Sequence, residues 1–341
     1  TGATGFIGGN LVRTLVRRGF NVRVLVRSLN SSQTIDNLDV EKVIGDLRDP
    51  DSLEKACDSC SLLFHTAAFY QLWSANRNDF YDINVTGTKN ILAAAQKKKL
   101  QKIVYTSTVG TIPYPDDPNF PSDETCFPTE KDLCNDYKRS KFQAEEIVKD
   151  FARCGLPVVI VNPSAPIGAM DVKPTPTGKI IIDFLQGKIP AIINTGLNVI
   201  DVEDVVEGHI LAADKGKVGE RYILGHRNLS LLEIYETIAR LTGRPAPRWK
   251  IPYRLALCAA YGSELVARLS GGRPKIPLGA VRMASKYMYF SSQKAVRELG
   301  LPQSPIENAF RKSIHWFETN GYLVSKHPAA QKKIYNPAPP C

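Results

Sequence analysis

The sequence predicts an α/β fold, in which helices cover both faces of a doubly wound parallel sheet. Runs of β-branched residues alternate with helical patterns through the first half of the chain, as in parallel sheets. The chain opens on the glycine-rich turn TGATGFIGG, which is typical of the junction between a parallel strand and a helix. Its 341 residues, 43% of them apolar, are enough to bury a sizeable core.

The elements follow in strand and helix order. Strands are predicted at 21–26, 40–44, 61–64 and 102–106, and helices at 11–18, 52–56, 86–98 and 137–151. A glycine turn of this kind follows a buried strand, which we expect before residue 1. We therefore interpret the chain as truncated at its N-terminus, with the first strand of the sheet missing.

The glycines of the opening turn, Gly2, Gly5 and Gly8, are three residues apart. Side chains at these positions would keep the backbone away from a pyrophosphate, and a helix beginning near Phe6 offers free N–H groups to phosphates. The turn predicts a Rossmann-type dinucleotide site that also includes Thr4 and Ile7. The alternative is an ordinary glycine-rich loop.

The ends of the first two visible strands indicate which dinucleotide binds. A carboxylate at the end of the first would bind a ribose 2′-hydroxyl, whereas an arginine accommodates a 2′-phosphate, and this strand ends at Arg27. NADP(H) is therefore favoured, and NAD(H) stays possible. Asp46 and Leu47 follow the next strand, where the carboxylate is placed to contact an adenine amine or simply lies in solvent.

Tyr137 and Lys141 lie four residues apart, on one face of a predicted helix. The preceding strand ends in the hydroxyl-rich run Thr106-Ser107-Thr108. A hydroxyl facing a Tyr/Lys helix beside a nicotinamide is the arrangement that hydride transfer to a carbonyl requires. Tyrosine with a pKa of about 10 is a poor acid–base group at neutral pH, but nearby positive charge lowers that pKa.

Together these motifs resemble the extended short-chain dehydrogenase/reductases, or NAD-dependent epimerase/dehydratase family, over about residues 1–322. The other matching motifs are GDL at 45–47, HTAA at 65–68, NVTGT at 84–88 and NPS at 162–164. The chain looks most like the branch that holds dihydroflavonol 4-reductase and 3β-hydroxysteroid dehydrogenase. The stretches 174–210 and 283–300 are similar to hopanoid-associated sugar epimerases.

The resemblance implies roles for individual residues. Tyr137 would be the general acid–base group, Lys141 would hold the nicotinamide ribose, and Thr108, preferred over Ser107, would hydrogen-bond the reacting oxygen. Asn84 would support the active-site helix through its backbone. The remaining cofactor contacts implied are Thr66, Ala67, Ala68, Pro163 and Ser164.

Substrate contacts are expected in the C-terminal part of the chain and beside Tyr137. The Pro- and Thr-rich loop 168–178, which carries Lys173, is placed to close over a substrate. Tyr70 and Trp73 would form another wall, or simply pack a loop on the core. The expected division is a cofactor domain at 1–165, completed by about 198–225, and a substrate lobe at 166–197 and 226–322. The tail 323–341 is expected to be disordered.

Composition favours a cytoplasmic enzyme without nucleic-acid partners. The net charge of +10 is spread along the chain, and seven cysteines, an odd number, favour a reducing compartment. No metal-site spacing is present. The apolar segment 255–269 allows a peripheral membrane contact, but core packing is the favoured interpretation. A homodimer through the helices 86–98 and 137–151 is possible.

Three functions remain open. The first is a reductase or dehydrogenase acting on a secondary alcohol or ketone, and the second is a sugar epimerase or dehydratase that uses the nicotinamide transiently. The third, a non-catalytic nucleotide sensor, would have little need of the Tyr137/Lys141 pair.

Overall fold

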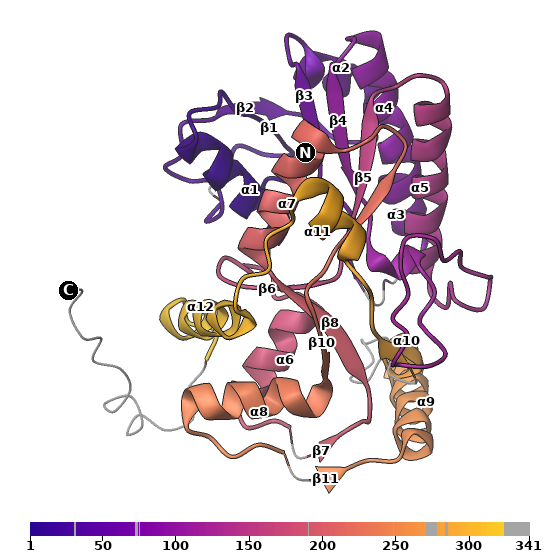
Figure 1. The fold of residues 1–341 in the computed structure, drawn as a ribbon, viewed down its shortest axis with the longest axis vertical. Coiled ribbons are helices and arrows are strands. Elements are labelled where there is room, and N and C mark those ends of the chain that lie inside the picture. Colours follow the sequence, from indigo (N-terminus) through magenta and orange to yellow (C-terminus); the bar gives the residue numbers. More distant parts are fainter. Residues whose placement is uncertain are drawn as a thin grey trace, which may run out of the picture.

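The computed structural model describes residues 1–30, 32–71, 74, 76–189, 191–247, 249–270, 278–283 and 286–323. Its main sheet has four parallel strands in the order β3-β4-β5-β9 (Figure 1). These are β3 (Leu62–His65), β4 (Lys102–Thr106), β5 (Val158–Pro163) and β9 (Arg221–Leu224). A separate parallel pair is formed by β1 (Arg23–Val26) and β2 (Glu41–Ile44). Each strand predicted from the sequence is thus present, within two residues of its predicted bounds.

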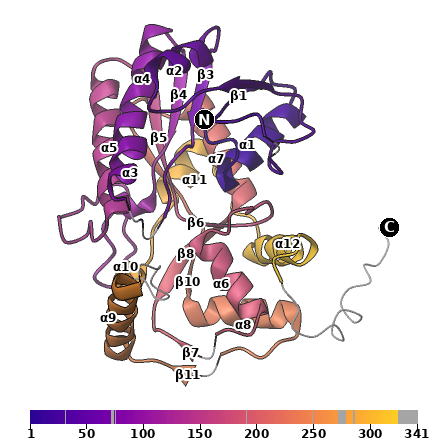
Figure 2. The same cartoon turned by 180° about the vertical axis from the view of Figure 1, so that it is seen from behind.

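Helices cover both faces of this sheet, which confirms the doubly wound α/β fold (Figures 1 and 2). They are α1 (Phe6–Arg17), α2 (Pro50–Cys57), α3 (Asn78–Tyr81), a π-helical turn η1 (Asp82–Thr86), α4 (Gly87–Lys97), the 3₁₀ turn η2 (Val109–Thr111), α5 (Asp136–Arg153), α7 (Val202–Lys215) and α11 (Gln293–Leu299). Successive residues of β4 point to opposite sides, as the pleat requires. Ile103 and Tyr105 pack in a core with α4 and α5, whereas Val104 packs in a core with α7 and α11.

A second, smaller sheet lies beside the first. Its strands are β6 (Ala165–Ile167), β8 (Gly196–Asp201), β10 (Arg227–Ser230) and β12 (Tyr287–Met288), and β8 pairs with the other three. The helices packed there are α6 (Pro176–Leu185), α8 (Leu231–Thr242) and α12 (Ile306–Thr319), with Phe184, Ile238 and Phe310 in their common core. The remaining elements are β7 (Ala191–Ile192), β11 (Trp249–Lys250), α9 (Tyr253–Ser270) and α10 (Leu278–Met283).

Local chemistry explains where several helices begin. The Asn135 side chain accepts a hydrogen bond from the Lys138 amide and so caps α5, and Thr175 caps α6 in the same way at Gly178. Ser230 and Glu233 form a reciprocal capping box at the start of α8. The Asn135 cap fixes the first turn of α5, which carries Tyr137.

A cavity of about 770 Å³ separates β1 from β3. The Thr1 amino group donates to Phe64 O at 2.9 Å, so the start of the chain reaches one end of β3. Within the described residues, no helix has the length and hydropathy needed to cross a membrane.

Candidate functional site

Tyr137 lies in the first turn of α5, and Lys141 follows one turn later on the same face. Lys141 is 1% exposed, and its Nζ donates to the Tyr105 hydroxyl and to Thr106 O, both at 2.8 Å. Burial lowers the pKa of Lys141 to about 7, although the nearby Glu145 carboxylate acts in the opposite direction. An ammonium has three donors, so one is left for another acceptor.

The strand end beside α5 supplies the hydroxyl that the sequence predicts. Burial, reinforced by Tyr70, raises the pKa of the Tyr137 phenol above its usual range, whereas a hydrogen bond with the Thr108 side chain lowers it. Ser107 donates instead to the buried Glu145 carboxylate. The Ser107 hydroxyl is thus already engaged with Glu145, whereas the Thr108 side chain lies beside Tyr137.

The opening turn has the shape that a pyrophosphate requires. Gly2 has φ +79°, and a Cβ there would lie 2.4 Å from Thr66 Oγ1; a Cβ on Gly8 would lie 2.2 Å from Gly2 O. The nearest atom to a Cβ on Gly5 is Gly2 O at 3.2 Å, so the outer side of the turn is open. Thr4 and Gly5 are exposed there, and Ile7 packs against the core.

In the first turn of α1, no side chain of the described residues occupies the backbone amides that an anion would bind. No side chain caps the helix at Gly5, and the turn contains no acidic residue. A helix N-terminus that presents free amide groups attracts phosphate oxygens. The glycines and α1 therefore fit the diphosphate of a dinucleotide.

The ends of β1 and β2 bring Arg27 and Asp46 close together. Arg27 is exposed, and its charge contributes to the low pKa of the Asp46 carboxyl, which is about 2 mainly because Arg48 hydrogen-bonds to it. Arg48 Nε and an Nη donate to the two carboxylate oxygens at 2.9 and 2.8 Å. The Asp46 carboxylate is thus already paired, and Arg48 is a residue that the sequence reasoning missed. Leu47 is buried beside Gly87.

Asn84 lies in η1 and connects the active-site helix to the loop after β3. Its Nδ2 donates to Ser140 Oγ on α5 at 3.0 Å, and its Oδ1 accepts from the Phe69 amide at 2.7 Å. The same loop carries Thr66, Ala67 and Ala68, and Thr66 Oγ1 donates to Thr1 O at 2.8 Å. The loop is therefore held between the opening turn and α5.

The junction of β5 with β6 places Pro163 and Ser164 at the carboxyl edge of the main sheet. The Ser164 amide donates to Leu224 O at 3.0 Å, which joins this edge to β9. Its hydroxyl oxygen is buried, and within the described residues it has no hydrogen-bond partner. A bound nicotinamide amide would satisfy this oxygen.

Of the substrate contacts predicted from the sequence, the structure places Tyr70 next to Tyr137, with ring centroids 4.9 Å apart. Lys173 is exposed in the loop 168–178, and Trp73 lies outside the described residues. Asp171 anchors this loop by accepting from the amide and hydroxyl of Thr175, and burial raises its pKa to about 6. Met170 beside it has φ +72°, a strained conformation for a residue with a side chain.

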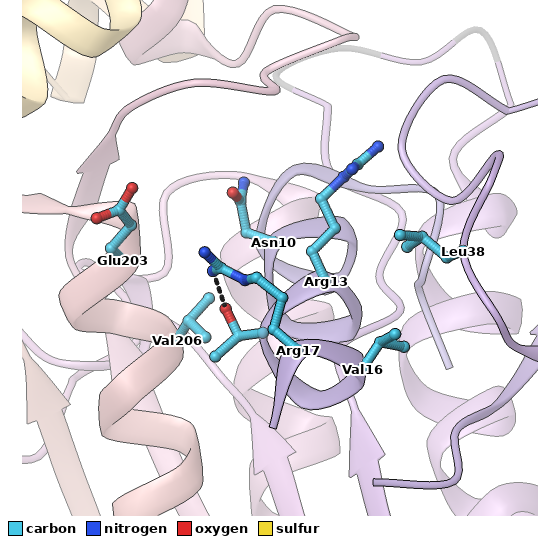
Figure 3. A pocket seen from close by; sticks show the side chains of 8 residues that line it. Asn10, Arg13, Val16, Arg17, Leu38, Glu203 and Val206 are labelled. Atoms are coloured by element: carbon cyan, nitrogen blue, oxygen red, sulfur yellow. Dashed lines mark hydrogen bonds between the residues drawn. The ribbon is translucent and has the colours of Figure 1, made fainter. Parts of the chain in front are cut away.

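A second cavity, of about 280 Å³, lies between α1 and the start of α7 (Figure 3). It is lined in part by Asn10, Arg13, Arg17 and Glu203 and contains none of the predicted site residues. Across the described part of the chain, no group of three or more His, Cys, Asp or Glu side chains is arranged to hold a metal ion.

Comparisons with known proteins give a consistent result. The NAD dependent epimerase/dehydratase family matches residues 1–225. The chain is 46% identical to "Putative dihydroflavonol 4-reductase" of Synechocystis sp., with 96% of each chain covered. It is 34% identical to sterol demethylase protein B of Methylococcus capsulatus, over 95% of this chain and 98% of that protein.

Solved structures agree. The crystal structure of gox2253 matches with a TM-score of 0.84 at 40% identity, over 94% of this chain and 98% of that one. PA4631, a nucleoside-diphosphate-sugar epimerase from Pseudomonas aeruginosa, matches with a TM-score of 0.76 at 26% identity, over 94% and 97%.

Proposed function

Because the chain belongs to the NAD-dependent epimerase/dehydratase family and is an enzyme, we propose that it interconverts a ketone and a secondary alcohol, with NADP(H) as its preferred cofactor. The observation that carries the proposal is the placement of Tyr137 and the buried Lys141 one turn apart on the same face of α5. The resemblance to a protein named as a dihydroflavonol 4-reductase supports reduction as the direction of the reaction.

The residues of this chain would manage the proton and the position of the substrate. When bound, NAD(P) supplies the hydride and, in its oxidised form, a positive charge. In the direction of reduction, Tyr137 would give its phenolic proton to the ketone oxygen, and in oxidation it would take that proton back. Thr108 would hydrogen-bond the same oxygen. Lys141 would use its remaining donor to hold the nicotinamide ribose.

The preference for NADP(H) is supported by the charge at the ends of β1 and β2. Arg27 is exposed beside Arg48, and the nearby Asp46 carboxylate is held by Arg48. A 2′-phosphate would meet two guanidinium groups there, with the carboxylate already neutralised.

Denaturing the purified protein and identifying the released nucleotide tests the cofactor, together with titrations of NADPH and NADH. We expect little retained nucleotide and tighter binding of NADPH. Arg27→Glu should weaken NADPH binding about tenfold through loss of one charge-assisted contact, with NADH affected less. Arg153→Glu, an exposed change at the far end of α5, is the control and should alter neither. Equal loss of both cofactors in Arg27→Glu would contradict the NADP(H) assignment.

Turnover tests the catalytic assignment. With a panel of prochiral ketones that includes a dihydroflavonol and a sterol ketone, Tyr137→Phe should lower kcat by about 10²–10⁴ because it removes the proton donor. Cofactor affinity should stay within about twofold, because this hydroxyl contributes chemistry rather than cofactor binding. Unchanged kcat in this variant would refute the role of Tyr137.

A sugar epimerase is the second candidate, favoured by the match to PA4631. An epimerase regenerates its cofactor within each cycle and has no need to release it. Stoichiometric NAD in the denatured protein would support this candidate over the reductase.

A further inference from the structure

Helix α9 has two faces of different character. Tyr253, Ala256, Leu257 and Ala260 pack in a small core with α10, and Glu264 accepts a hydrogen bond from the Leu278 amide at the start of α10. The opposite face is exposed. The sequence favoured core packing for the whole segment 255–269, and the structure corrects this: only half of the helix circumference is packed.

The exposed face is a continuous apolar stripe. Exposed positions recur every three or four residues, at 255, 258, 262, 265 and 269, which places them on one side of an α-helix. Its large side chains are exposed by between 51% (Tyr261) and 82% (Leu269), and they also include Leu255, Leu265 and Val266. Single exposed apolar residues need no explanation, but a contiguous stripe of them indicates a binding surface.

The surroundings of this stripe are basic. Among the residues described near the helix, the one acidic side chain of α9 is Glu264, whose carboxylate faces α10 rather than the stripe. Lys250, Arg254 and Arg282 are exposed near the helix. Trp249, 76% exposed just before the helix, adds an amphipathic aromatic ring of the type found at membrane–water interfaces.

We propose that α9 docks the enzyme on an anionic lipid bilayer, with the stripe inserted among the acyl chains and the basic residues at the headgroups. The helix does not have the hydropathy to cross a membrane, so it lies in the interface plane. Anionic headgroups complement the surrounding cations. A second copy of the chain carries the same cations beside the same stripe and so offers them no opposite charge.

The place of α9 suits this role. Helix α9 lies at the edge of the half of the molecule that contains the smaller sheet. It is away from the helices that cover the main sheet (Figures 1 and 2). The enzyme can therefore rest on a surface through α9 without covering α1 or α5. The inference concerns location and stands whether or not the proposed reaction is correct.

Sedimentation with lipid vesicles tests the proposal directly. The purified wild-type protein should pellet with vesicles of phosphatidylcholine and phosphatidylglycerol, pellet less with phosphatidylcholine alone, and dissociate at high salt. The double variant Leu265→Glu with Leu269→Glu should bind at least about tenfold more weakly, because two charges would enter the acyl region. The control, Val218→Glu with Ile44→Glu, adds the same charge at exposed apolar positions away from α9 and should bind as the wild type does.

A second measurement avoids the need for a folded stripe variant. Trp249 fluorescence should be quenched by brominated acyl chains in anionic vesicles, and the quenching should disappear in Trp249→Phe. Absence of vesicle binding by the wild type would overturn the proposal. So would wild-type binding by the stripe variant, or a wild-type dimer in sedimentation velocity that the stripe variant abolishes, since a second copy would then occupy the face.

Discussion

Lys141 donates a hydrogen bond to Tyr105, a residue outside the Tyr137/Lys141 motif. Its ammonium is buried, and the Tyr105 hydroxyl is one of the two acceptors that it has. Tyr105 is itself fully buried on β4, on the side of the sheet that faces α5. The Lys141 ammonium therefore has a second tyrosine as a hydrogen-bond acceptor, from the strand rather than from the helix.

We expect Tyr105→Phe to lower the pKa of Lys141 below its value of about 7. A hydrogen bond to a charged group contributes about 1.5–3 kcal/mol, so the shift should be about one to two pH units. If the ammonium is the active form, the alkaline limb of the kcat/KM profile moves to lower pH by that amount. Tyr114→Phe is the control, because the Tyr114 ring lies under Lys138 and does not contact Lys141. An unchanged alkaline limb would show that the Tyr105 hydroxyl has no such role.

Sequence reasoning about single residues succeeded where a motif fixes position along the chain. It placed Tyr137 and Lys141 on one helix face, as the structure has them. It expected Asn84 to support that helix through its backbone, whereas the observed contact is a hydrogen bond from the Asn84 side chain to Ser140. Tyr105 was missed because its role depends on which side of β4 it faces. Tyr105 lies two residues after Ile103, so the two share one face of the strand, and this spacing was the available signal. Arg48 was missed because it acts on the preceding Asp46 turn rather than within a motif.

In helix α6, a close contact at Gly178 reverses the usual effect of replacing a helical glycine by alanine. Replacing a helical glycine by alanine usually stabilises a protein by about 0.5–1 kcal/mol. At Gly178, however, a Cβ would lie 2.1 Å from the Asp171 carboxylate and 3.0 Å from Phe317. The helix therefore needs a glycine where the anchored loop passes over it.

We expect Gly178→Ala to lower the free energy of unfolding by about 1–3 kcal/mol, as overpacking does. Gly262→Ala is the matched helical substitution: in α9 nothing lies within 4 Å of the added Cβ, so this variant should be stabilised by about 0.5–1 kcal/mol. Urea unfolding of both variants measures the two signs. If Gly178→Ala raised the free energy of unfolding instead, the Asp171 carboxylate would have to move away from the added methyl group at little cost.

The sequence predicted the long elements well and the short ones poorly. The helices at 86–98 and 137–151 and all four predicted strands are present, because each has a clear apolar period and a buried face. β6, β7, β11 and β12 have two or three residues each, and pairing with a neighbour rather than composition defines them. For α9, the apolar composition favoured core packing and left a membrane contact possible, and the structure shows which of its positions are exposed.

At the scale of the whole molecule, Glu145 holds several parts of the main sheet together. Its fully buried carboxylate accepts hydrogen bonds from Ser107, Thr111 and Asn162, and it pairs with Arg221 of β9 at 3.2 Å. Burial alone would raise the pKa of Glu145, but Lys149, Ser107 and Arg221 outweigh it and lower the pKa. The charge thus links α5 to the ends of β4 and β5 and to β9.

We expect Glu145→Gln to reduce the free energy of unfolding by about 3–5 kcal/mol at pH 7, because Arg221 would lose its counter-charge. The folded-state pKa of Glu145 is lowered, so its stabilisation is present above the unfolded value near 4.5 and is lost as the pH falls through the folded value. The difference between variant and wild type should therefore shrink in acid. Glu146 pairs with Lys149 at the surface, so Glu146→Gln should change the free energy of unfolding by less than about 1 kcal/mol. Equal effects of the two variants in urea unfolding would contradict this account.

The connections between the two sheets have a mechanical consequence. Ser164 alone joins β5 to β6, α7 starts directly after β8, and Gly225 and His226 join β9 to β10. These crossings are neighbours, since the Ser164 amide bonds to Leu224 O and Ile167 pairs with Asp201. If one sheet slid along the other, these connections would have to lengthen, and connections of two residues or fewer cannot do so. The short connections therefore oppose a shear motion of one sheet along the other, and a hinge rotation about the line of connections is the motion that they permit.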